Sequence, residues 1–294
     1  MESQAIPIKK ILVPLLETSD DRRAILHAVE IARPLGAHVT VMFSGGHLSE
    51  LVCADPPIYG RVKPPLQIEA RTLLAEQTEA ARKAFESLVS EHGLTVADAP
   101  DGHSAGTLGF EARRGPIEAT IQEAAVFNDL VLFYRDSDTA GTESLGFTTL
   151  KSALQDCGRP LLVVPAMVSR PFASSIAIGF NGSIEGAHAV SAALSMLTAA
   201  KSVHILTIAT QKTSADQAQK LQSYLAWHGI RAEVHTSKPG SESVGATLLG
   251  MAAAVGADLF VIGGYTHNRI RQTILGGVTH HVVRHARVPV FFSK

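Results

Sequence analysis

The chain has 294 residues, a formal net charge of −1 and a hydrophobic content of 46%, a length that allows two ordinary domains. The balanced charge lacks the basic excess of a nucleic-acid-binding protein, and no apolar run is long enough to span a bilayer. The two cysteines, Cys53 and Cys157, lie far apart and make no disulfide framework, so with no signal-peptide pattern we expect a cytoplasmic protein without membrane contact.

Strand and helix patterns alternate through the first half of the chain. We expect Ser19 or Asp20 to cap the first helix. Residues 44–67 are rich in proline and glycine and are predicted to be a long loop. The predicted strands are residues 11–16, 38–43, 95–99, 130–134 and 161–164, and the predicted helices are residues 21–35, 68–92, 116–127 and 148–156.

The same order of elements returns in the second half, after a linker at residues 165–173. The predicted strands are residues 175–180, 203–210, 231–236, 259–262 and 289–293, and the predicted helices are residues 184–200, 215–228, 244–255 and 277–286. A constant offset of 129 relates Asp129 to Asp258, and an offset of 165 relates Ile11 to Ile176. These offsets indicate a duplicated β-α-β-α unit, with domains at residues 1–168 and 169–294.

One stretch of the second half combines the features of an anion site. The buried strand at residues 259–262 ends in Gly263 and Gly264, where the missing Cβ atoms would let a phosphate or ribose approach. Farther on, Gly276 and Gly277 open a helix, whose first N–H groups and positive dipole end favour an anion.

This stretch resembles the universal stress protein family, whose nucleotide-binding members carry the motif G-x2-G-x9-G-[ST]. The four motif positions fall on Gly263, Thr266, Gly276 and Gly277, so the first and third match. Thr279 could supply the hydroxyl one turn into the helix. Two interpretations stay open: a working phosphate site, or an α/β turn whose glycines serve only the backbone geometry.

The resemblance covers nearly the whole chain and implies its architecture. It implies two tandem α/β domains of Rossmann-like, adenine nucleotide alpha hydrolase-like fold. Each would be an open five-stranded parallel sheet of strand order 3-2-1-4-5 with helices on both faces. The fifth strands, residues 161–164 and 290–293, would pair as they do between single-domain family members, and a homodimer would be a further level of assembly.

The resemblance also assigns site residues. Asn181 stands where the family has an aspartate that contacts the nucleoside, and Ile208 stands at the position that contacts adenine. The predicted nucleotide site consists of Phe180, Asn181, Ile208, Gly263, Thr266, His267, Arg269, Gly276, Gly277, Val278 and Thr279.

The first half departs from the family pattern. The aspartate position falls on Leu16, and the glycine-motif positions fall on Tyr134, Ser137, Phe147 and Thr148. Only the last of these four matches, and an aromatic side chain stands where a phosphate should approach. We predict that this half keeps the fold and has lost the nucleotide site.

No catalytic constellation is recognisable. His281 and His285 are four residues apart on a predicted helix, but no acidic residue or cysteine adjoins them, so we predict a solvated helix face and no metal site. H-E-x-x-H does not occur, and G-x-S-x-G occurs only at residues 102–106, which no predicted helix follows directly. The resemblance implies a stress-response regulatory protein that binds ATP or AMP, with Mg²⁺ accompanying ATP, and without a catalytic constellation we expect at most weak ATP hydrolysis. The alternative is a dimerisation scaffold of the same fold that binds no nucleotide.

Overall fold

The structure, a computed structural model, describes residues 7–16, 20–46, 64–99, 106–135, 145–166, 172–209, 215–264 and 276–294. The chain divides into two compact units. The N-terminal unit comprises residues 8–134 and 143–157, and the C-terminal unit comprises residues 158–294 together with 1–7 and 135–142. Among the described residues, no helix combines the length and the apolar character needed to cross a membrane.

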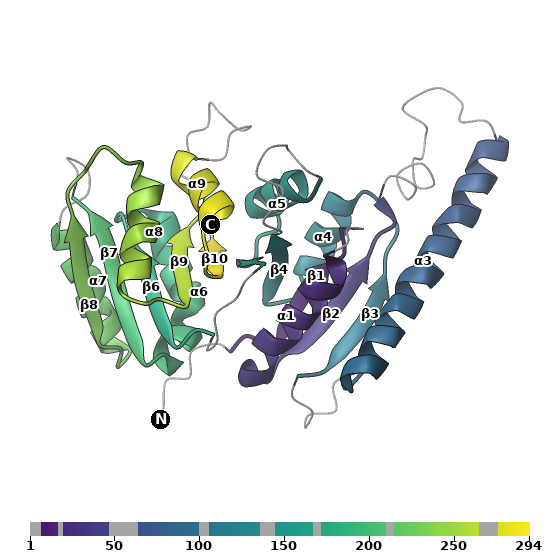
Figure 1. Cartoon of the computed structure of the whole chain (residues 1–294), viewed down its shortest axis with the longest axis horizontal. Helices are drawn as coiled ribbons and strands as arrows, with labels where there is room; N and C mark the ends of the chain where they lie inside the picture. Colours follow the sequence, from purple (N-terminus) through teal and green to yellow (C-terminus); the bar gives the residue numbers. More distant parts are fainter. Residues whose placement is uncertain are drawn as a thin grey trace. The chain divides into compact units, whose positions relative to one another are not determined.

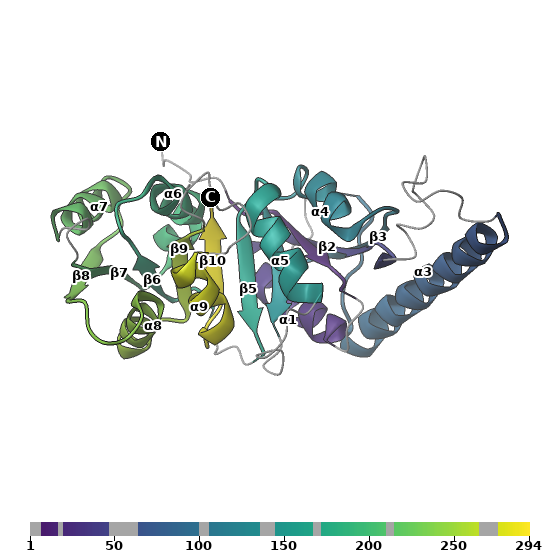
Figure 2. The ribbon, with the colours of Figure 1, turned by 90° about the horizontal axis from the view of Figure 1, so that it is seen from above.

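The N-terminal unit has an α/β fold built on parallel strands in the order β3-β2-β1-β4. Its strands are β1 (Lys10–Pro14), β2 (His38–Phe43), β3 (Leu108–Ala112) and β4 (Leu130–Arg135). Its helices are α1 (Asp21–Leu35), α3 (Pro64–His92), α4 (Ile117–Ala125) and α5 (Leu145–Asp156). Figures 1 and 2 show α1 and α4 on opposite faces of this sheet.

The third strand lies later in the chain than the sequence pattern predicts. The predicted strand at residues 95–99 makes only an isolated bridge, from Val96 to Leu108, and β3 forms instead at Leu108–Ala112. Gly109 interrupts the apolar pattern of β3 and lies close to its neighbours. A Cβ at Gly109 would lie 3.2 Å from His38 Nε2 and 3.3 Å from the carbonyl oxygen of Ala97.

Polar contacts at the start of α1 also differ from the prediction. Asp20 stands at the N-cap but makes no side-chain capping bond, and Ser19 lies outside the described residues. The carboxylate of Asp21 instead accepts a hydrogen bond of 3.0 Å from the N–H of Leu16. The predicted cap at Asp20 is therefore wrong, because the next carboxylate binds the incoming loop.

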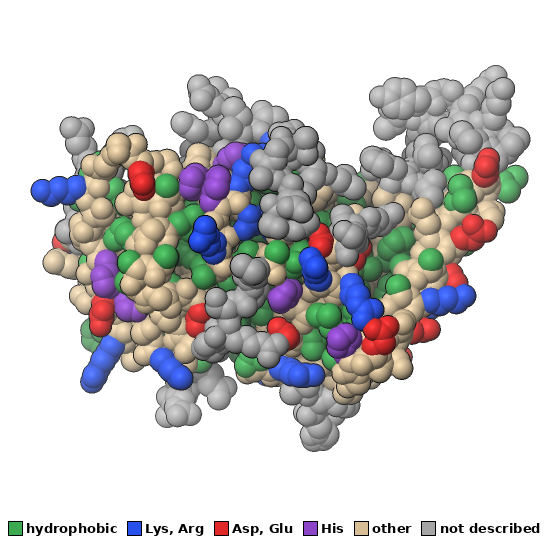
Figure 3. All heavy atoms as spheres, viewed as in Figure 1, with side chains coloured by type: hydrophobic (Ala, Val, Ile, Leu, Met, Phe, Trp, Pro, Cys, Tyr) green, Lys and Arg blue, Asp and Glu red, His purple; other side chains and the backbone are tan. Residues whose placement is uncertain are grey.

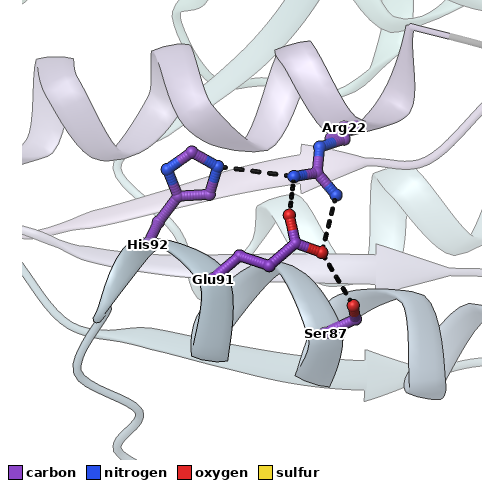
Figure 4. Close-up of polar contacts among 4 residues, drawn as sticks. All are labelled: Arg22, Ser87, Glu91 and His92. Carbon is purple, nitrogen blue, oxygen red and sulfur yellow. Dashed lines mark hydrogen bonds and ion pairs between the residues drawn. The ribbon is translucent and has the colours of Figure 1, made fainter.

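An exposed ion pair joins α1 to the last turn of α3 (Figure 4). Arg22 donates to the carboxylate of Glu91, which also accepts a hydrogen bond of 2.9 Å from the hydroxyl of Ser87. The hydrogen bond from Arg22 holds the pKa of Glu91 below its ordinary value. Any stability that this pair contributes is therefore present above the ordinary pKa and is lost as the pH falls through the lowered one.

The C-terminal unit repeats the fold with the strand order β8-β7-β6-β9-β10, which is the predicted order 3-2-1-4-5. Its strands are β6 (Ser175–Gly179), β7 (Ser202–Ile208), β8 (Ala232–Ser237), β9 (Leu259–Gly263) and β10 (Val290–Ser293). Its helices are α6 (Ile184–Ala199), α7 (Ala215–Trp227), α8 (Val244–Ala254) and α9 (Gly277–His285). Figure 2 shows α6 and α7 on one face of the sheet and α8 and α9 on the other.

A sixth strand, β5 (Leu161–Pro165), joins this unit. It pairs antiparallel with β10, with Val163 opposite Val290 and Leu161 opposite Phe292. The sequence repeat puts a boundary at residue 168, whereas the contacts group β5 with the C-terminal unit. The apolar edge of β10 is thus covered by a strand of the same chain.

One aspartate in each unit fixes the start of the central strand. Asp129 accepts hydrogen bonds of 2.8 and 2.9 Å from the N–H groups of Lys9 and Lys10. Asp258 accepts bonds of 3.1 and 3.0 Å from the N–H groups of Ser174 and Ser175. Because Lys10 and Ser175 are related by the offset found in the sequence, the same clamp recurs in both repeats. Burial raises the pKa of Asp258, while these hydrogen bonds act in the opposite direction.

We expect Asp258→Ala to lower the free energy of unfolding by about 1–3 kcal/mol, because two backbone donors lose their shared acceptor. Asp129→Ala should have a similar effect on its own unit. Urea denaturation followed by circular dichroism measures both changes. Asp216→Ala, which removes only an exposed helix ion pair with Lys220, is the control and should change stability by less than about 0.5 kcal/mol. Equal stability of all three variants would contradict the clamp.

Candidate functional site

A cavity of about 280 Å³ lies at the carboxyl ends of the strands of the C-terminal unit. It opens between β6 and β9, where the strand order reverses, which is the usual ligand position in an open α/β sheet. Its lining consists of Gly179, Phe180, Asn181, Ser183, Glu185, Ile208, Val244, Leu248, Ile262, Gly263, Gly276, Gly277, Val278 and Thr279.

The first turn of α9 presents backbone donors to this cavity. Gly276 is the N-cap and makes no side-chain capping bond, and the first bond within the helix runs from the N–H of His280 to the carbonyl of Gly276. In α6 and α8, by contrast, Ser183 and Ser243 cap the first turn at 3.1 and 3.2 Å. The start of α9 therefore offers uncapped N–H groups and a positive dipole end to an anion.

No Cβ blocks the approach to these donors. A Cβ placed at Gly276 or Gly277 would have no atom of the described chain within 4 Å. Thr279 follows in the same turn and its side chain is only 6% exposed. No described side chain therefore stands in front of the N–H groups at this point.

The opposite wall of the cavity is apolar. Ile208 comes from the end of β7, Ile262 from β9, and Val244 and Leu248 from the first two turns of α8. Phe180 follows β6, and its ring lies against Gly186, where a Cβ would be 3.2 Å from the ring. Such a wall suits the flat face of a base.

Asn181 stands at the family's aspartate position and holds the turn between β6 and α6. Its side-chain oxygen accepts a hydrogen bond of 3.1 Å from the N–H of Ser183. The oxygen is thus occupied by the local turn, and the amide NH₂ group is the part of this exposed side chain that remains to donate to a ligand.

Gly263 has a structural role that the sequence interpretation missed. A Cβ at this position would lie 2.6 Å from the backbone nitrogen of Gly186 and 2.7 Å from the carbonyl carbon of Glu185. This glycine therefore allows the close approach of α6, and its role in the approach of a phosphate stays a prediction. Gly263 still forms part of the cavity floor.

Glu185 was not predicted and lies in the same cavity. Glu185 lies in the first turn of α6 and is only 7% exposed. In the described part of the chain, no hydrogen bond or ion pair reaches its carboxylate. A buried carboxylate favours a ligand that brings a cation or hydrogen-bond donors. The sequence did not mark Glu185 as a site residue, because only the packing in the structure shows that it is buried.

Eight of the predicted site residues come together around this cavity. They are Phe180, Asn181, Ile208, Gly263, Gly276, Gly277, Val278 and Thr279. The other three predicted residues, Thr266, His267 and Arg269, lie outside the described residues.

The equivalent region of the N-terminal unit is built differently. The ring of Tyr134, at the end of β4, stacks on His27 of α1 with centroids 5.6 Å apart. An aromatic side chain thus occupies the strand end where the other repeat has Gly263. Phe147 and Thr148 lie on α5, and Ser137 lies outside the described residues. A separate cavity of about 490 Å³ lies between α1 and α3, with Ile25 and Phe85 among its lining residues.

Two histidine groups lie elsewhere in the C-terminal unit. His281 and His285 stack on α9 with ring centroids 4.2 Å apart, and His285 Nδ1 is 2.8 Å from the carbonyl oxygen of His281. His204 and His235, on β7 and β8, lie beside Glu233. Burial and the nearby His235 hold the pKa of His204 below its ordinary value, against the opposing effect of Glu233.

Comparison with known proteins adds to this geometry. The sequence model of the universal stress protein family matches residues 173–294, which include all the elements that line the cavity. The second half of the chain is therefore similar to the universal stress protein family. A separate comparison with curated proteins found no match.

Solved structures of universal stress proteins extend the likeness in fold to both repeats of the chain. One from Archaeoglobus fulgidus aligns with a TM-score of 0.69 and 14% identity, over 97% of this chain and 98% of its own. A putative one from Pseudomonas aeruginosa aligns with a TM-score of 0.58 and 14% identity, over 98% of this chain and 93% of its own.

The same architecture also occurs outside the family. The cytoplasmic domain of a prokaryotic cation chloride cotransporter aligns with a TM-score of 0.50 and 12% identity, over 97% of this chain and 95% of its own. These likenesses show the fold, and the ligand has to be argued from the cavity itself.

Proposed function

We propose that this protein is a regulatory member of the universal stress protein family that binds one adenine nucleotide, ATP or AMP, in its C-terminal unit. The observation that carries the proposal is the uncapped start of α9, which opens onto a cavity with an apolar wall at the switch point of the sheet. An anion-binding end and an apolar wall in one cavity suit a ligand that joins phosphates to a base.

Each part of the ligand has a matching group. The N–H groups of Gly277 and Val278 would hold phosphate oxygens, and Thr279 would add a hydroxyl. The apolar side chains of Ile208 and Leu248 would face the base, and the amide of Asn181 would donate to the ribose. His267 and Arg269, which follow Gly263 in the sequence, would add positive charge from the loop.

Magnesium would accompany ATP. Mg²⁺ takes oxygen ligands and in nucleotide sites is usually held by phosphates, waters and one or two carboxylates. Among the residues that line the cavity, Glu185 supplies the carboxylate. We assign it the role of a magnesium ligand or of an acceptor for a nucleotide hydroxyl.

The cavity supports binding better than catalysis. Its described lining contains no histidine, lysine or cysteine, and the side chain of Ser183 accepts the capping bond of α6. Nucleotide binding would act by changing the surface offered to a partner. ATP hydrolysis, if measured, should be weak.

The scaffold function is the second candidate, and one observation favours it. Because Gly263 is required by the packing of α6, half of the matching motif has a purely structural explanation. In this alternative the cavity stays empty and the protein acts through assembly. Pairing of the two repeats through their fifth strands, a homodimer and a cytoplasmic location belong to both proposals.

Thermal unfolding separates the two candidates. With the intact chain, we expect ATP with Mg²⁺ and AMP to raise the unfolding temperature of the C-terminal unit in a saturable way, because a ligand that binds only the native state stabilises it. Nucleotide extracted from the purified protein should be an adenine nucleotide. Absence of extractable nucleotide, together with no shift at a saturating concentration, would favour the scaffold.

A further inference from the structure

Three potential metal ligands converge on neighbouring strands, on the sheet face that carries Ile208. His204 of β7 lies directly opposite Glu233 of β8. Two residues farther along both strands, Leu206 lies opposite His235. Side chains two residues apart on a strand point to the same face. The register therefore puts Glu233, His235 and His204 on one face, about 13 Å along β7 from Ile208.

The three ligand atoms form a compact triangle. His204 Nδ1 is 3.1 Å from His235 Nε2 and 3.6 Å from Glu233 Oε2, and His235 Nε2 is 3.8 Å from the same Glu233 oxygen. Tetrahedral zinc bonds of about 2.0–2.1 Å would place neighbouring ligand atoms about 3.4 Å apart. The separations are thus close to those that an ion at the centre requires.

We propose that His204, Glu233 and His235 bind one divalent transition metal ion of the Zn²⁺ type. Two imidazoles and one carboxylate form a ligand set that zinc accepts with its fourth position open. Among the described residues, these three side chains form the group whose ligand atoms lie close enough together to share one ion.

The surroundings fit an accessible site that is fixed on one side. His204 is buried to 9% exposure, His235 is partly buried and Glu233 is exposed. Figure 3 shows histidine side chains beside an acidic side chain over β8. Since β8 ends the strand order of its sheet, a shared ion would tie this outer strand to β7.

The competing explanation is a hydrogen bond between the two imidazoles, in which one ring donates and the other accepts. That arrangement accounts for the 3.1 Å separation but needs no contribution from Glu233. The carboxylate therefore distinguishes the two explanations. It can be changed with little risk to folding because its side chain is 74% exposed.

The test uses the intact chain after treatment with a chelator. Titration with Co²⁺ should give the visible absorption of a low-symmetry site, and Zn²⁺ should displace the Co²⁺ at one ion per chain. Glu233→Gln should weaken Zn²⁺ binding at least tenfold, and His235→Ala should remove the Co²⁺ absorption. Zn²⁺ should raise the unfolding temperature of the wild type but not of His235→Ala.

The matched control is His285→Ala, which removes one ring of the other histidine pair and should leave Zn²⁺ binding unchanged. The proposal is overturned if Co²⁺ gives no absorption with the wild type. It is also overturned if Glu233→Gln binds Zn²⁺ as tightly as the wild type, or if His285→Ala and not His235→Ala abolishes binding.

Discussion

Replacing Gly277 with valine is expected to reduce ATP binding by at least a hundredfold while leaving the fold intact. The β-branched side chain would stand in the open space in front of the first turn of α9, where phosphate oxygens must reach the N–H groups. Equilibrium dialysis with labelled ATP measures the change in affinity.

The stability of this variant should change little. Gly277 does not have a positive φ, and no atom of the described residues lies within 4 Å of an added Cβ. The first helical position therefore accepts a side chain, at a cost below about 1 kcal/mol. Unchanged ATP affinity in a folded Gly277→Val protein would mean that this turn is structural only.

Replacing Gly263 with alanine, unlike Gly277→Val, is expected to cause a large loss of stability. The new methyl group would lie 2.6 and 2.7 Å from backbone atoms of Gly186 and Glu185, and backbone cannot move aside as a flexible side chain can. We expect the free energy of unfolding of the C-terminal unit to fall by about 3 kcal/mol or more. Urea denaturation measures the loss.

Gly250→Ala is the matched control for this variant. Gly250 lies within α8, and an added Cβ there would meet nothing within 4 Å. Alanine should therefore stabilise the helix by up to about 1 kcal/mol. If Gly263→Ala were as stable as the wild type, the close packing of α6 on β9 would be disproved. Approach of a ligand would then be the remaining explanation for a glycine at this position.

The sequence was most informative where strands and helices alternate with short connections. In the C-terminal unit, every predicted element forms within one or two residues of its predicted bounds. The paired clamps of Asp129 and Asp258 show that the offset between the repeats reflects a shared structural part. The third strand of the N-terminal unit was misplaced because the residues before it also alternate, while Gly109 weakens the pattern of the true strand.

The candidate site could be predicted in part. The residues at strand ends were placed correctly around the cavity, because parallel strands bring their carboxyl ends to one edge of the sheet. Glu185, Val244 and Leu248 were missed, because nothing in a single sequence says which turn of a helix faces a cavity. The sequence also did not show why position 263 is a glycine, since only the structure shows that the backbone of α6 approaches it.

The histidine trio shows a different limit of sequence reasoning. Glu233 and His235 are separated by one residue on a predicted strand, which is a weak signal for a shared face. Their third partner, His204, lies a whole strand and helix earlier. Only the register between β7 and β8 puts it opposite Glu233, and strand register cannot be read from one sequence.

The most direct test of the nucleotide-binding account is the number of ATP molecules bound by the intact chain, measured by calorimetry in the presence of Mg²⁺. We predict one molecule per chain, because the C-terminal unit has the open start of α9 and the corresponding strand end in the N-terminal unit is occupied by Tyr134. Two molecules per chain would contradict the predicted loss of the first site. No binding at all would contradict the central claim, and the protein would then be better described as a scaffold of the same fold.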